Sequence, residues 1–163
     1  PNPLNPRHAW ALRKPLSGYA KWWIGHQVSA AHWSPIQMSD AKLAGHTKFA
    51  QRYLSQSGMR ISTTMRTFQL KLADRQCPMS ALSLDIQSAV VMLVSSLYAK
   101  ASSDPITRAA ADTVCRELQL KITGGKASNA DFRQVTGLGS QIAEQGWSEL
   151  DGVTSGAIMM PYK

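Results

Sequence analysis

Apolar residues recur at helical spacing along most of this chain, and the clearest run lies between Pro78 and Ser102. Within it, large apolar side chains return every three or four residues, which predicts one buried helix stripe: Leu82, Ile86, Ala89, Leu93 and Leu97. Four more apolar residues widen the stripe to over half the circumference: Val90, Val91, Val94 and Tyr98. We therefore expect other helices to cover this segment. Its Asp85, Gln87 and serines argue against a membrane span.

Three further helices are predicted around this central one. The first runs from about residue 40 to 75, starts at the capping residue Asp40 and bends near Gly58. The second begins after the Asp104-Pro105 cap and ends at Gly124-Gly125. The third begins after Ser128 and ends at Gly146, with Trp147 folding back on the bundle. Their inward stripes are expected at Ile61, Met65, Phe68 and Leu72, at Ile106, Ala110, Val114, Leu118 and Ile122, and at Phe132, Val135, Leu138 and Ile142.

These patterns predict an all-α fold, a four-helix bundle with an irregular N-terminal arm rich in Pro and Trp. We place the arm at residues 1–38 and the helical bundle domain at residues 39–163. Prolines interrupt the arm repeatedly, although a short helix is possible between Leu16 and Ala31. No alternating strand pattern and no glycine-rich phosphate loop occurs.

Length and cysteine content narrow the class of protein. A chain of 163 residues with 44% hydrophobic content suits one globular domain, or one domain with an arm. Cys77 and Cys115 show no metal-ligand spacing, so we expect partly buried free thiols in a reducing compartment. The first residue is Pro1 and not Met, which suggests a piece of a longer or processed protein.

Charge is distributed very unevenly. The net charge is +8, but residues 1–75 carry eleven Lys or Arg and two acids, whereas residues 76–163 are close to neutral. Such asymmetry points to an anionic partner: phospholipid, nucleic acid or an acidic protein face. For the basic helix, a merely solvated cationic face remains the open alternative.

The arm also holds four of the five tryptophans, interspersed with basic residues. Trp beside Lys and Arg is typical of a membrane–water interface, although the same rings could pack against a neighbouring domain or the bundle. The histidines have no carboxylate at a useful spacing, so we expect no His-based catalytic or metal site. The candidate membrane or partner contacts are Arg13, Lys14, Lys21, Trp22, Trp23, Lys48 and Arg52.

Four ordered pieces between Lys48 and Gly156 carry a family resemblance. They are KFAQRYLSQSGMRISTTM, VVMLVSSLYAKAS, AADTVCRELQLKI and DFRQVTGLGSQIAEQGW, the last followed by a GVTSG turn. In this order and with these link lengths, the span resembles the extra C-terminal helical domain of very-long-chain acyl-CoA dehydrogenases.

The resemblance implies an accessory domain of a FAD-dependent enzyme of fatty-acid β-oxidation. The family's flavin site, acyl-CoA pocket and catalytic glutamate lie upstream, so no catalytic, cofactor-binding or metal residue is assigned within this chain. Implied partners are the catalytic core, an anionic membrane surface and, for the parent enzyme, a second copy in a homodimer. The implied location is intracellular, peripheral on the inner membrane, on the bacterial cytoplasmic or mitochondrial matrix side.

A free-standing basic helical module that binds nucleic acid or an acidic protein is the alternative. The charge of residues 1–75 supports it, but no recognition-helix motif stands out, so we do not expect nucleic acid as the partner. An independent enzyme is the third possibility, and the chain lacks paired catalytic groups in any motif.

Overall fold

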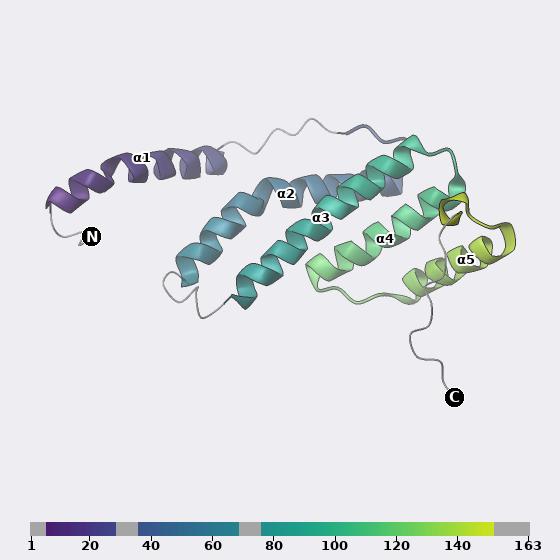
Figure 1. Ribbon diagram of the computed structural model, residues 1–163. Helices are drawn as coiled ribbons and strands as arrows, with labels where there is room; N and C mark the ends of the chain where they lie inside the picture. Colours follow the sequence, from purple (N-terminus) through teal and green to yellow (C-terminus); the bar gives the residue numbers. More distant parts are fainter. Residues whose placement is uncertain (1–5, 29–35, 69–75, 152–163) are drawn as a thin grey trace.

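The computed structural model describes residues 6–28, 36–68 and 76–151, and this part of the chain is helical without strands (Figure 1). It contains five α-helices and a short 3-10 helix, η2 (Ser148–Leu150). The helices are α1 (Pro6–Val28), α2 (Ala41–Phe68), α3 (Cys77–Ala101), α4 (Pro105–Thr123) and α5 (Asn129–Gln145). The prediction of an all-α bundle is confirmed.

Local capping chemistry sets the ends of the helices as the sequence predicts. The Asp104 carboxylate accepts hydrogen bonds from the backbone N–H of Ile106 and Thr107 at 3.1 and 3.0 Å, which starts α4. Ser128 and Asp131 form a reciprocal capping box at the start of α5. Gly124 ends α4 in the left-handed conformation, with φ of 67°.

The two N-terminal helices run through residues that often interrupt helices, Pro15 in α1 and Gly58 in α2. Helix α2 continues through Gly58, as expected, because one glycine costs only about 1 kcal/mol in a helix interior. Helix α1 begins at Pro6, which suits a first helical position, and extends well beyond the short helix predicted between Leu16 and Ala31.

The core lies where α2, α3 and α4 meet. One layer joins Leu43, Ala99 and Ala111, and the next joins Ala50, Met92 and Cys115, so each helix contributes one residue to each layer. Small side chains at most of these positions let the helix axes approach closely. Helix α5 packs against α4, while α1 extends to one side and contacts α2 (Figure 1).

The predicted buried stripe of α3 is only partly confirmed, because Leu82, Ile86 and Leu93 are partly buried and the most buried side of the helix lies next to the stripe. The buried residues of this helix are mostly small, namely Ser88, Ala89, Met92, Ser96 and Ala99. Of the predicted stripe only Ala89 is fully buried, and Leu97 is 39% exposed. The stripe is displaced because close three-helix packing selects small residues for the interior, whereas periodicity analysis weights large ones.

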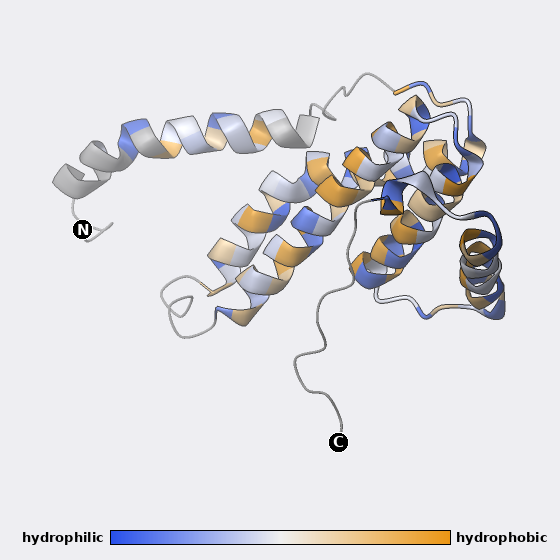
Figure 2. Ribbon diagram, turned by 45° about the vertical axis from the view of Figure 1, so that its right-hand side comes forward, coloured by the Kyte–Doolittle hydropathy of each residue, from blue (hydrophilic) through white to orange (hydrophobic). Residues whose placement is uncertain are grey.

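The expectation that other helices would cover α3 is confirmed on one side only, where α2 and α4 pack against it. Val90, Val91, Val94 and Tyr98 are between 44% and 59% exposed. By length and composition α3 could cross a membrane, contrary to the sequence-based expectation, although core helices of water-soluble proteins pass the same test. Along each helix of the bundle, hydrophobic and hydrophilic positions alternate (Figure 2).

The inward stripes of the last two helices are only partly confirmed. Ile106 is buried, but Val114 is 42% exposed, and Phe132 and Val135 are 60% and 54% exposed. Helix α5 has no fully buried residue, because only α4 packs on it to any extent among the described elements. Trp147 does fold back, as predicted: its indole N–H donates to the Thr107 hydroxyl at 2.9 Å.

Candidate functional site

All the Lys, Arg, Asp and Glu residues of helices α1 and α2 are basic ones. Neither contains an Asp or Glu, and their bases are Arg7, Arg13, Lys14, Lys21, Lys42, Lys48, Arg52, Arg60 and Arg66. The five basic residues among the predicted contacts are all exposed: Arg13, Lys14, Lys21, Lys48 and Arg52. This surface suits an anionic partner of any of the classes considered above.

The predicted contact residues fall into two separate groups. Arg13, Lys14 and Lys21 lie on α1, where the Arg13 guanidinium stacks over the Trp10 ring at 4.3 Å. Lys48 and Arg52 lie on α2, about 9–15 Å along its axis from Gly58, where α1 makes contact. The structure therefore does not gather the predicted residues into one cluster.

The two predicted tryptophans face different surroundings. Trp22 is 37% exposed and reaches α2, where its ring carbon lies 3.4 Å from the position of a Cβ built on Gly58. Trp23 is half-buried, and its indole N–H has no hydrogen-bond partner among the described residues. Packing on the bundle, the second reading of these rings, thus accounts for part of the Trp22 surface.

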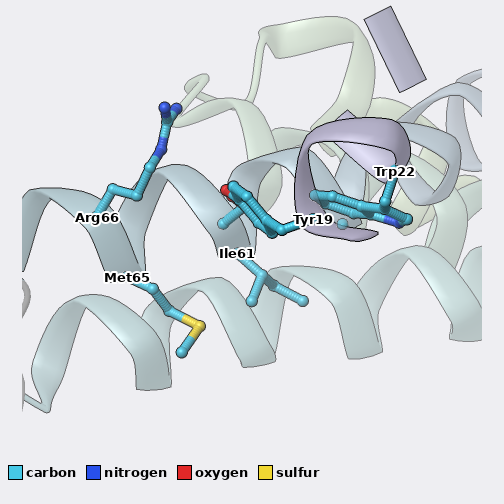
Figure 3. Close-up of a pocket in the computed structure, with 7 residues that line it drawn as sticks. Tyr19, Trp22, Ile61, Met65 and Arg66 are labelled. Carbon is cyan, nitrogen blue, oxygen red and sulfur yellow. The ribbon is translucent and has the colours of Figure 1, made fainter. Parts of the chain in front are cut away.

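An apolar groove opens between α1 and α2 (Figure 3). It is an open trough with a volume of about 710 Å³, and the Tyr19 and Ser62 hydroxyls hydrogen bond to each other in it. Tyr19 and Trp22 are in contact, with ring centroids 5.7 Å apart. The lining residues are Tyr19, Trp22, Gly58, Ile61, Ser62, Met65 and Arg66. We call this feature the α1–α2 groove.

A second surface, which we call the α3 face, is mainly apolar, and α3 contributes no charged side chain to it. It combines exposed large side chains along the outer side of the central helix: Leu84, Val90, Val91, Val94, Leu97 and Tyr98. Its polar groups are few: Gln87 bonds the Ser83 hydroxyl at 3.4 Å, and the Tyr98 hydroxyl donates to Glu149 at 2.8 Å. That carboxylate raises the pKa of Tyr98 by favouring the neutral phenol that donates to it.

A buried polar cluster joins α2, α4 and α5 through Asp112. Its carboxylate accepts from the His46 ring at 2.9 Å, Lys42 at 3.2 Å and Gln134 at 2.7 Å, and the other His46 nitrogen lies 3.2 Å from Gln119 Oε1. Burial acts to raise the pKa of Asp112, but these hydrogen bonds outweigh it and hold the pKa below the ordinary value. The expectation that no histidine meets a carboxylate is therefore wrong for His46.

Both thiols are free, but their environments differ more than predicted. Cys77 is exposed, whereas Cys115 is fully buried against the Ser96 hydroxyl at 3.4 Å. Burial raises the pKa of the Cys115 thiol, which makes it unreactive. Among the residues described, no three His, Cys, Asp or Glu side chains gather in a geometry that could hold a metal ion.

Sequence reasoning missed the groove and the polar cluster for different reasons. Tyr19 and Trp22 stand three residues apart, and Ile61 and Met65 four apart, which places each pair on one helix face. That the two faces meet is a tertiary fact. A signal for His46 did exist, because it falls on the same face as Leu43 and Ala50.

Comparisons with known proteins add no relative. No protein-family model, no curated protein and no solved structure matches this chain. The similarity to acyl-CoA dehydrogenases therefore stays a prediction from the sequence pieces quoted above.

Proposed function

We propose that this chain is an accessory helical domain that docks on a larger partner through the α3 face and contacts an anionic membrane through α1 and α2. The sequence resemblance names the partner we favour, the catalytic core of a FAD-dependent long-chain acyl-CoA dehydrogenase. The domain itself performs no chemistry in this proposal. It holds the enzyme at the surface from which very hydrophobic acyl substrates arrive.

The observation that carries the proposal is the exposure of the α3 face. Six large apolar side chains on one helix side form a continuous surface, and surfaces of this kind mark interaction sites. The opposite side of α3 is already used by α2 and α4. Docking would remove the exposed valines and leucines from water, which stabilises the complex by about 25 cal/mol per Å² of apolar area.

The chemistry of this face favours a protein partner over lipid hydrocarbon. Gln87 and Ser83 lie within the face, and Glu149 sits beside Tyr98. An amide and a carboxylate can find hydrogen-bond partners in a protein interface, but they are costly to bury in hydrocarbon. The basic helices, by contrast, suit lipid headgroups, since each Lys or Arg near an anionic leaflet contributes about 1 kcal/mol.

Site-specific photo-crosslinking tests the docking. A photoreactive amino acid replaces Val91 in the polypeptide expressed from the whole gene. The same amino acid at Glu144, an exposed position on α5, serves as the control. We expect adducts from position 91 to flavin-dehydrogenase peptides and none from position 144. Adducts only to lipid, or only to α3 of a second copy, would overturn this docking.

Vesicle co-sedimentation tests the membrane contact. We expect binding to vesicles of mixed zwitterionic and anionic phospholipid at low salt, weakening as salt screens the charges. Charge reversal at Arg13 and Lys14, combined with Trp22→Ala and Trp23→Ala, should lower the bound fraction strongly. Absence of binding, or binding unchanged in the combined variant, would refute membrane attachment.

The alternative of a nucleic-acid module is favoured by one observation, the absence of acids from α1 and α2. It makes a contrasting prediction: affinity for duplex DNA that falls steeply with salt, with a slope set by the number of phosphates contacted. It gives no account of the α3 face.

A further inference from the structure

The α1–α2 groove combines an apolar trough with an arginine at one end, and Trp22 is the one lining residue that it shares with the predicted membrane contacts. We propose that it binds one molecule of a single-chain anionic amphiphile, with the alkyl chain along Trp22, Ile61 and Met65 and the anionic head at Arg66. This is a discrete site of fixed stoichiometry. It goes beyond surface attachment to a membrane and does not depend on it.

The walls of the groove fit an alkyl chain. Its volume of about 710 Å³ falls in the range of small-molecule sites, about 300–1,000 Å³. The two hydroxyls in it, on Tyr19 and Ser62, already bond each other. Apart from Gly58 and the terminal Arg66, the remaining lining is apolar: the Trp22 ring, Ile61 and Met65. A ligand rich in hydrogen-bonding groups, such as a nucleotide base, would find few partners here.

The order of residues along α2 gives the groove two different ends. Figure 3 shows Trp22 at one end, Tyr19 and Ile61 in the middle, and Met65 at the other end, where the long Arg66 side chain also starts but points away from Met65. Gly58 lies beneath Trp22, where a Cβ built on the glycine would touch the ring at 3.4 Å. From Gly58 to Arg66 the helix rises about 12 Å, which suits a medium-length alkyl chain with its head at the arginine.

Charge selects the head group. Arg66 is exposed and takes part in none of the ion pairs among the described residues. Neither helix that forms the groove contributes a carboxylate, so nothing on them repels an anion or competes for the guanidinium. A carboxylate and a phosphate share the required chemistry, since both accept paired hydrogen bonds from arginine.

Titration calorimetry on the full 163-residue chain tests the site with soluble probes below their micelle concentrations. The arms are decanoate, decyl phosphate, decanol and inorganic phosphate. We expect one-to-one saturable binding of both anionic amphiphiles, weaker binding of decanol and none of phosphate alone. The ratio of the two anionic affinities distinguishes a fatty acid from a phospholipid-like ligand.

Matched variants locate the probe. Arg66→Gln should weaken decanoate binding about fivefold, the value of a partly exposed charge pair, and leave decanol unchanged. Arg52→Gln removes the same charge from α2 outside the groove, so it should leave decanoate binding unchanged while reducing vesicle binding. Failure of membrane attachment and failure of this site are thereby separable.

A second readout does not depend on the charge. Bromine-substituted decanoate should quench tryptophan fluorescence, and Trp22→Phe should abolish most of the saturable quenching. Met65→Trp fills the groove and should weaken binding of every amphiphile, with helicity checked by circular dichroism. Binding only above the micelle concentration, equal affinity for decanoate and decanol, or quenching unchanged in Trp22→Phe would each overturn the site.

Discussion

Asp112 is the residue through which three helices share one buried carboxylate. It accepts hydrogen bonds from Lys42 and His46 of α2 and from Gln134 of α5. Asp112→Asn replaces one carboxylate oxygen, a hydrogen-bond acceptor, with an amide NH2 group. This new donor would then face the donor groups that bind the carboxylate in the wild type. We expect the free energy of unfolding to fall by about 2 kcal/mol, measured by urea denaturation at neutral pH. Glu144→Gln, at an exposed position of α5, is the control and should change stability by less than about 0.5 kcal/mol.

The same carboxylate makes stability depend on pH. Because the pKa of Asp112 lies below its ordinary value of 3.8, its contribution is fully present above about pH 4. The contribution is lost as the pH falls through the lower folded-state pKa. Unfolding curves recorded down the acid limb should therefore fall less steeply for Asp112→Asn than for the wild type. Parallel curves would show that Asp112 is not a source of the acid sensitivity.

The two cysteines should react with thiol reagents at very different rates. Cys77 is exposed, while Cys115 is buried and its thiol pKa is raised, so labelling of Cys115 requires the helices to open. We expect Cys115 to react on the order of 100-fold more slowly in the native state. Measurement on Cys77→Ser isolates the buried thiol, and denaturant should restore its rate. Equal native rates would contradict the described packing.

At the scale of the element, two glycines in neighbouring segments should respond oppositely to alanine. Gly124 ends α4 with φ of 67°, where a side chain is strained, so Gly124→Ala should cost about 1 kcal/mol. Gly139 lies inside α5 with open space around a built Cβ, so Gly139→Ala should stabilise by about 0.5–1 kcal/mol. Thermal unfolding followed by circular dichroism measures both.

The Gly139→Ala variant also tests the role of the glycines inside α5, which the sequence left open. Gly137 and Gly139 could either weaken the helix or admit a close neighbour, and none of the described residues lies within 4 Å of a Cβ built at either position. A destabilising Gly139→Ala would mean that another surface approaches α5 there.

At the scale of the whole molecule, the exposed and buried sides of α3 should differ sharply in their effect on stability. Met92→Ala removes a side chain from the junction of three helices and should cost about 2–4 kcal/mol. Val94→Gln alters the α3 face, where the residue is 59% exposed, and should change stability by about 0.5 kcal/mol or less. Chemical denaturation of the chain alone provides both values.

The comparison separates folding from docking. If Val94→Gln destabilises the isolated chain as much as Met92→Ala does, the α3 face is covered within the chain itself. The docking proposal would then lose the observation on which it depends.

Much of the architecture could be predicted because it depends on neighbours in sequence. Asp104 with Pro105, Ser128 with Asp131, and Gly124 act within one helical turn, so their residue types suffice to place the helix ends. The basic character of α1 and α2 is likewise a property of composition.

Orientation could not be predicted in the same way. Which side of α3 turns inward depends on how closely α2 and α4 approach, and that selected Ala89, Ser96 and Ala99 over the larger valines. His46 and Asp112, 66 residues apart, meet for the same reason.

The sequence by itself thus determined the all-helical fold, the ends of α3, α4 and α5 and the basic excess, because capping, periodicity and charge are local. Only the tertiary structure decided which apolar residues stay exposed and which helices form a groove. Which surfaces pack together depends on residues that are distant in sequence, and side-chain size at the contact decides how closely the helices approach. The α3 face and the α1–α2 groove both result from this packing, and the proposed functions depend on them.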